Sequence, residues 1–159
     1  MHPNAELIER FYTAFAARDH REMAACYLPN ATFSDPAFPH LEGERIAGMW
    51  RMLCLRGKDL ELTFSNVSAD DQKGSADWEA IYTFGATGRR VHNRIVASFE
   101  FEDGGIRRHV DRFDFYRWTR MALGPTGTLL GWSRLLQGKV RRQAAKQLDK
   151  FLAREAAQS

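Results

Sequence analysis

Residues 91–118 read VHNRIVASFEFEDGGIRRHVDRFDFYRW, two runs of alternating polar and apolar residues around the turn Asp103-Gly104-Gly105. In the first run the apolar side chains share the odd positions, at Val91, Ile95, Ala97, Phe99 and Phe101. Alternation with a period of two is typical of a strand with one buried face, and a short turn with glycine is typical of a hairpin. The stretch therefore predicts two paired antiparallel strands, 91–102 and 106–118.

Two further alternating runs, 59–68 and 76–84, precede this hairpin, and three amphipathic helical patterns precede those runs. The first helix is expected to be capped by Asn4, the second begins at Asp19 and stops at Pro29, and the third ends near Gly57. A short strand, 31–35, separates the second helix from the third. Helices and a sheet that each have one apolar face bury those faces by packing on one another. The sequence therefore predicts an α+β fold, with a curved, mostly antiparallel sheet packed on three N-terminal helices and an extra C-terminal helix.

The chain has 159 residues, of which 44% are hydrophobic and 12% aromatic, and this is enough for one packed core. Residues 1–120 are expected to form one domain, and residues 121–159 a C-terminal extension with a basic amphipathic helix at 139–157. Residues 134–159 contain seven Lys and Arg against two Asp and Glu. Such a helix can bind nucleic acid or an anionic membrane surface, but its apolar stripe more often packs on its own domain or on a dimer mate. We expect neither a nucleic acid nor a membrane partner.

The sequence lacks the patterns that are typical of several other classes of protein. There is no apolar run of the length of a signal peptide or a membrane span, so a cytoplasmic location is expected. Cys26 and Cys54 lie in two different helical patterns and are interpreted as reduced, structural thiols. Neither a glycine-rich phosphate loop nor a metal-binding spacing occurs, and we predict no cofactor and no metal site.

The residues most suited to chemistry lie on the last predicted strand, where His109 and Asp111 share a face with Phe113. Burial beside apolar side chains disfavours a charged carboxylate, and a shifted carboxyl group paired with histidine makes a useful acid or base. The alternative is a structural role, in which both residues are hydrogen-bonded at the rim or ion-paired with Arg112 or Arg94, and pack against a partner chain. Asp35, at the end of the short strand, is a second candidate, although aspartate before proline also commonly initiates a turn.

Aromatic and apolar residues at the same periodicities are candidates for the wall of a pocket, although many such side chains only fill a core. The predicted substrate-binding residues are Phe11, Phe15, Phe33, Trp50, Trp78, Tyr82, Asn93, Ala97 and Phe113.

Taken together, the segments Phe11-Tyr12-Thr13-Ala14-Phe15 and Ala31-Thr32-Phe33-Ser34-Asp35-Pro36, with the third helix, resemble the nuclear transport factor 2-like superfamily. This superfamily includes ketosteroid isomerases, SnoaL-type polyketide cyclases and limonene epoxide hydrolases. The resemblance covers residues 5–120 and implies a cone-shaped domain, usually a homodimer through the convex sheet, that binds a small hydrophobic ligand.

The resemblance also assigns roles to particular positions. His109-Val110-Asp111 is similar to the His-x-Asp of SnoaL-type cyclases, in which the aspartate is the acid/base, and Asp35 is similar to the general base of ketosteroid isomerases. The oxyanion-hole tyrosine and carboxylic acid of those isomerases fall at Phe11 and Ala97, so steroid isomerisation is not expected.

Asp111 also falls at the position of an aspartate of limonene epoxide hydrolases, but their Arg-x-Asp partner falls near Trp78 and Ala80. The sequence thus favours acid/base chemistry by Asp111, aided by His109 and Asp35, on a small apolar compound. The alternative is a non-catalytic binding module.

Overall fold

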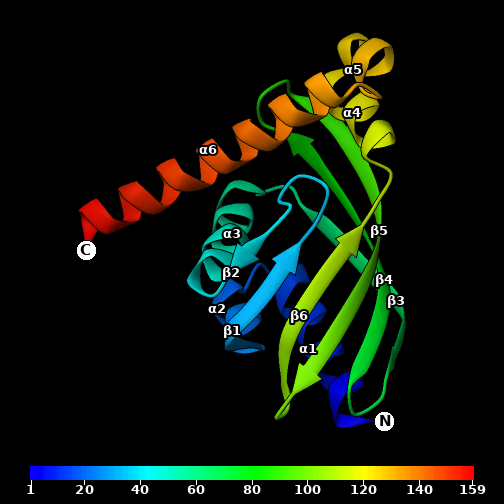
Figure 1. Ribbon diagram of the computed structural model, residues 1–159, viewed down its shortest axis with the longest axis vertical. Helices are drawn as coiled ribbons and strands as arrows, with labels where there is room; N and C mark the ends of the chain where they lie inside the picture. Colours follow the sequence, from blue (N-terminus) through cyan, green and yellow to red (C-terminus); the bar gives the residue numbers. More distant parts are fainter.

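The computed structural model describes residues 1–159 as a six-stranded sheet with helices along one face and at one end (Figure 1). The helices are α1 (Pro3–Ala16), α2 (His20–Ala25), α3 (Glu44–Arg56), α4 (Phe115–Leu123), α5 (Pro125–Leu130) and α6 (Arg134–Gln158). The strands are β1 (Tyr27–Ser34), β2 (Leu41–Glu42), β3 (Glu61–Ala69), β4 (Lys73–Phe84), β5 (Arg89–Glu102) and β6 (Gly105–Arg112). Their order in the sheet is β2-β1-β6-β5-β4-β3, and only the β1–β6 pair is parallel. The predicted α+β class and mostly antiparallel sheet are confirmed.

The alternating pattern fails where the last strand ends. The sequence predicted a strand as far as residue 118, but β6 ends at Arg112 and α4 begins at Phe115. The side chain of Asp114 accepts a hydrogen bond from the backbone N–H of Arg117 and so caps the helix. Phe115, Trp118 and Ala122 are buried at helical spacing. A short apolar run fits both periods, and here the cap decides between them.

Other boundaries also differ from the prediction. The second helix stops at Ala25, so Tyr27 opens β1 instead of ending a helix. The segment Gly124-Pro125-Thr126-Gly127, whose composition is typical of a turn, instead begins α5, with proline at a position that suits a helix start. The basic helix begins at Arg134 rather than at residue 139. The cap of the first helix is His2 instead of Asn4.

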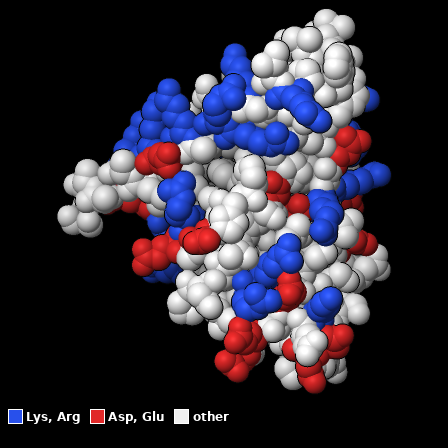
Figure 2. All heavy atoms as spheres, viewed as in Figure 1, with Lys and Arg blue, Asp and Glu red and all other residues white.

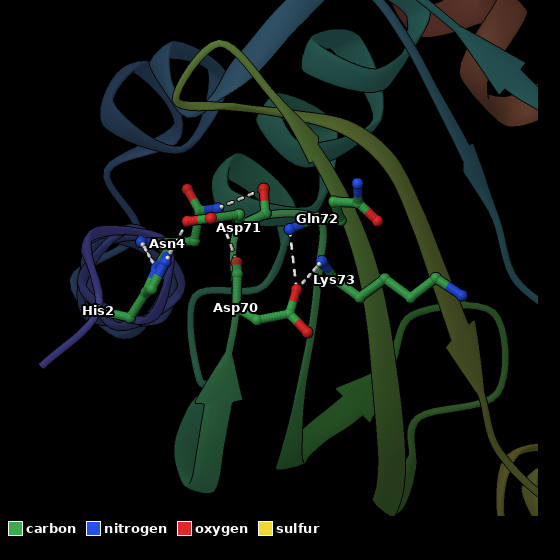
Figure 3. Close-up of polar contacts among 6 residues, drawn as sticks. All are labelled: His2, Asn4, Asp70, Asp71, Gln72 and Lys73. Carbon is green, nitrogen blue, oxygen red and sulfur yellow. Dashed lines mark hydrogen bonds and ion pairs between the residues drawn. The ribbon is translucent and has the colours of Figure 1, made fainter.

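The side chain of Asn4 instead binds the turn between β3 and β4 and so connects α1 to the sheet (Figure 3). Its side-chain amide donates to the carbonyl oxygens of Asp70, at 3.0 Å, and of Asp71, at 3.3 Å. Within the turn, a carboxylate oxygen of Asp70 accepts from the backbone N–H groups of Gln72 and Lys73, both at 2.8 Å. This fixes the N-terminal end of α1 against the sheet.

The core lies between α1, α3 and the concave face of the sheet. Its largest fully buried side chains are Trp50, Tyr12, Phe11 and Phe33, and His109 is fully buried among them. The aromatic rings meet mostly edge to face, for example Phe11 on Trp50 with ring centroids 5.7 Å apart. Such contacts are favourable for aromatic pairs and hold the rings in fixed positions. These rings therefore form a closely packed layer behind the residues that line the candidate site.

The C-terminal helix α6 crosses over α3 and runs on past the body of the protein (Figure 1). Leu148 anchors it with no exposed surface, and Leu152 packs on Gly48, where a Cβ atom would lie 2.6 Å from a methyl carbon of Leu152. An ion pair of 2.9 Å joins Arg45 to Asp149. Lys and Arg side chains gather over α6 in Figure 2, so its basic face points to solvent. No helix in the protein combines the length and the apolar character that a membrane crossing requires.

Candidate functional site

A cavity of about 830 Å³, called the pocket below, opens between the sheet, α3 and α6. Most of its lining residues are hydrophobic, and they come from every layer of the fold. Phe15 and Trp50 line it from α1 and α3, and Trp78 and Tyr82 line it from β4. Helix α6 forms the outer wall with Leu136, Lys139, Val140, Gln143, Ala144 and Gln147. The C-terminal extension is thus part of the pocket.

Two carboxyl groups, Asp35 and Asp111, line this pocket. Strands β1 and β6 pair in parallel with Ser34 opposite Val110; Asp35 directly follows the end of β1, and Asp111 is the next residue of β6. The parallel register therefore places the two acids side by side. Asp111 is 3% exposed and is buried among apolar side chains. Pairs of acids in an apolar site are a common source of acid/base chemistry.

The two carboxylate oxygens of Asp35 differ in their hydrogen bonds, because only Oδ1 binds the protein. Its Oδ1 accepts hydrogen bonds from the backbone N–H groups of Ala37, at 2.8 Å, and Phe38, at 2.6 Å. Its Oδ2 has no hydrogen-bonding partner. Burial raises the pKa of Asp35 to about 7; the nearby charge of Asp111 acts in the same direction, and the two N–H donors act against it. Asp35 can therefore both give and take a proton near neutral pH.

A chain of hydrogen bonds that begins at Trp50 ends at one carboxylate oxygen of Asp111. Nε1 of Trp50 donates to the hydroxyl of Tyr27 at 3.0 Å, that hydroxyl lies 2.7 Å from Nδ1 of His109, and Nε2 of His109 lies 2.8 Å from Oδ1 of Asp111. One proton arrangement gives every donor in this chain an acceptor: Tyr27 donates to Nδ1, and His109 carries its own proton on Nε2 and donates it to Asp111. Nε1 of Trp78 lies 3.4 Å from the same oxygen. Oδ2 of Asp111 is left without a partner.

The pocket brings together most of the residues that the sequence proposed. Asp35, Asp111, Phe15, Trp50, Trp78, Tyr82, Asn93 and Phe113 all line it. Phe11, Phe33, Ala97 and His109 do not, because they are buried in the core behind the wall. His109 has no exposed surface and reaches the pocket only through Asp111. It is a positioning residue in this geometry.

Sequence reasoning missed three parts of the site. Tyr27 was assigned to the second helix and Trp118 to a strand, so neither was considered. The wall from α6 was assigned to an extension outside the domain. The alternation of Ala31 and Phe33 could have extended β1 back toward Tyr27, whereas no local pattern shows that α6 folds over the pocket. No group of three or more His, Cys, Asp or Glu side chains lies close enough together to hold a metal ion.

Several solved protein structures have a fold similar to that of this chain. An NTF2-like protein of unknown function from Burkholderia pseudomallei superposes with a TM-score of 0.67 at 19% identity, covering 76% of this chain and 98% of its own. An LEH-like epoxide hydrolase from M. tuberculosis gives 0.62 at 21% identity, covering 82% and 97%. TerC, co-crystallised with polyporic acid, gives 0.64 at 17% identity, covering 76% and 98%. At these identities the likeness shows the fold.

A search of the curated proteins finds no match. The model of the SnoaL-like domain family, in contrast, matches residues 8–109, which include most of α1, every element from α2 to β5, and most of β6. This is well over half of the chain and contains Asp35 and His109, while Asp111 lies two residues beyond it. The protein therefore belongs to the SnoaL-like domain family, within the nuclear transport factor 2-like superfamily.

Proposed function

We propose that the pocket is the active site of an acid/base enzyme in which Asp111 transfers a proton to and from carbon on a small, apolar carbonyl compound. The observation that carries this proposal is the way in which the carboxyl group of Asp111 is held in an apolar cavity. One of its carboxylate oxygens is held by His109, and the other has no partner in the protein. A carboxylate fixed in this way presents one free, oriented oxygen to a bound ligand.

The reaction balances without an external electron donor or acceptor. Oδ2 of Asp111 takes a proton from a carbon next to the carbonyl group. The electron pair of the broken C–H bond forms a C=C bond, and the π pair of the carbonyl group moves onto its oxygen to give an enolate. Asp35, protonated in part near pH 7, is suited to supply a proton at the second position. Protonation of carbon completes a tautomerisation or isomerisation, and proton exchange with solvent returns Asp111 to its carboxylate and Asp35 to its acid form.

Two reactions of related families receive less support from this geometry. Phe11 and Ala97, which fall at the oxyanion-hole positions of ketosteroid isomerases, are buried in the core and do not line the pocket. Trp78 and Ala80 line the pocket at the positions where limonene epoxide hydrolases carry a charged pair, and neither side chain is charged. Proton transfer at carbon needs only the groups that are present.

The test uses β-tetralone, an apolar ketone with acidic C–H groups, as a probe. The protein is expected to accelerate exchange of the α-hydrogens for deuterium in D₂O, followed by NMR. Asp111→Asn should reduce this rate by about 10² to 10⁴. Asp103→Asn, at the exposed β5–β6 turn, is the matched control and should retain the wild-type rate.

Binding of the same ketone, measured by quenching of the fluorescence of the pocket tryptophans, separates the outcomes. Equal exchange rates for wild type and Asp111→Asn would remove Asp111 from the mechanism. Tight binding with no exchange above the buffer rate would refute the enzyme and leave the apolar pocket as a site for non-catalytic binding of small molecules.

A further inference from the structure

The hydroxyl group of Tyr82 has a proton that the protein does not use. Nε1 of Trp118 donates to the Tyr82 oxygen at 2.8 Å, and the hydroxyl has no acceptor within the protein for its own proton. Both side chains line the pocket. An indole N–H can only donate, so the Tyr82 oxygen is fixed as an acceptor toward Trp118 and its O–H is free for a ligand. Hydrogen bonds in series polarise one another, which makes this O–H a stronger donor.

Asn93 presents a second group without a partner. It lies on the buried face of β5, is 7% exposed, and lines the pocket. Its side-chain amide makes no hydrogen bond with the protein, although buried amide groups are nearly always paired. The amide atoms keep some accessible surface, because the Tyr12 hydroxyl is the one fully buried side-chain polar atom without a partner. The pocket therefore exposes the Asn93 amide to a ligand or to water. The amide is therefore placed to bind a polar atom of a ligand.

The two groups are neighbours on adjacent strands. In the β4–β5 ladder, Ala80 lies opposite Asn93 and Tyr82 lies opposite Val91, so Tyr82 and Asn93 are diagonal neighbours on the same face. Residues in this relation are within mutual reach when one of them has a long side chain. One ligand atom can thus contact both the phenol O–H and the amide N–H.

The pair lies at a distance from Asp111 along the sheet, whereas Asp35 is nearer: burial, and after it the charge of Asp35, raises the pKa of the Tyr82 hydroxyl. Asp111 is opposite Ala97 in the β5–β6 ladder, and Ala97 is four residues along β5 from Asn93. Four residues of extended strand span about 13 Å. A ligand that contacts both places is therefore elongated, and the cavity of about 830 Å³ has room for it.

We propose that Tyr82 and Asn93 form a paired hydrogen-bond donor site, with Trp118 as its positioning residue, for a carbonyl or phenolate oxygen at the end of an elongated apolar ligand. This inference rests on the proposed function only for the reaction at the Asp111 end. In a conjugated substrate the donor pair also stabilises the charge that moves onto this distant oxygen when Asp111 removes a proton. The substrate class is then an extended, conjugated carbonyl or phenolic compound whose oxygen is remote from the reacting carbon.

Binding of para-nitrophenol, whose anion absorbs visible light, tests the donor pair without any turnover. Nitrobenzene is the matched apolar probe without the hydroxyl group. Tyr82→Phe and Asn93→Leu should each weaken binding of the nitrophenolate about tenfold or more, because each removes a donor to a charged oxygen. Binding of nitrobenzene should be unchanged in both variants, which also shows that the pocket is intact.

Trp118→Phe tests the positioning role. It should lower the fraction of bound nitrophenol that is ionised at a fixed pH while leaving nitrobenzene binding unchanged. Tyr116→Phe is the control for loss of a tyrosine hydroxyl, because Tyr116 donates to the carbonyl oxygen of Thr128 outside the pocket lining. It should match wild type in every measurement.

The proposal is overturned if wild type binds no nitrophenolate, or if Tyr82→Phe and Asn93→Leu bind it as tightly as wild type does. The outcome is distinguishable from the fate of the proposed function. Asp111→Asn should retain nitrophenolate binding while it loses exchange of tetralone hydrogens, so either inference can fail while the other stands.

Discussion

Replacing Asp35 by Asn should make the protein more stable at pH 8 and leave its stability at pH 4 nearly unchanged. The pKa of Asp35 rises from its ordinary value of 3.8 to about 7 on folding, chiefly through burial. Between these two values the unfolded chain has lost the proton that the folded protein keeps. The free energy of unfolding that this group contributes is therefore fully present below about pH 4 and is lost as the pH rises toward 7. The change corresponds to about 4 kcal/mol as an upper limit, since each pKa unit is worth about 1.4 kcal/mol.

Urea denaturation of wild type and Asp35→Asn at several pH values from 4 to 8 measures this directly. Asn keeps an oxygen that can accept from the N–H groups of Ala37 and Phe38, so the turn should be preserved. The difference in unfolding free energy between variant and wild type should grow with pH up to about 7 and then stay constant. Asp103→Asn, in an exposed turn, should show no such growth. A pH-independent difference for Asp35→Asn would refute the burial argument.

Two predictions concern the C-terminal extension. Gly127→Ala should destabilise the protein by about 1–3 kcal/mol or more, because a Cβ atom there would lie 1.9 Å from the carbonyl oxygen of Thr119. Calorimetry should show a lower Tm for this variant. Gly85→Ala is the control and should leave the Tm unchanged, because a Cβ atom at Gly85 would have no other atom within 4 Å. Leu148→Ala should cost about 2–5 kcal/mol, since this side chain is fully buried under α6. Leu135→Ala, on the same helix but 84% exposed, is its control, and equal urea midpoints for the two variants would contradict the packing of α6.

Local patterns account for most of the fold. The alternation of Val91, Ile95 and Phe99 determines which face of β5 is buried, and the same rule placed Asp111 on the inward face of β6. These signals are local, because a strand exposes and buries alternate residues whatever its partners are. The rule failed at Phe115, where the apolar spacing suited both a strand and a helix.

The candidate site needed the tertiary structure. The sequence by itself determined that an acid and a histidine share a buried face, and that aromatic residues surround them. It could not show that Asp35 lies beside Asp111, because that follows from a parallel pairing between strands far apart in the chain. Nor could it show that α6 closes the pocket or that Trp118 donates to Tyr82. Contacts of this kind depend on how separate elements pack, and their residues carry no periodic signal along the chain.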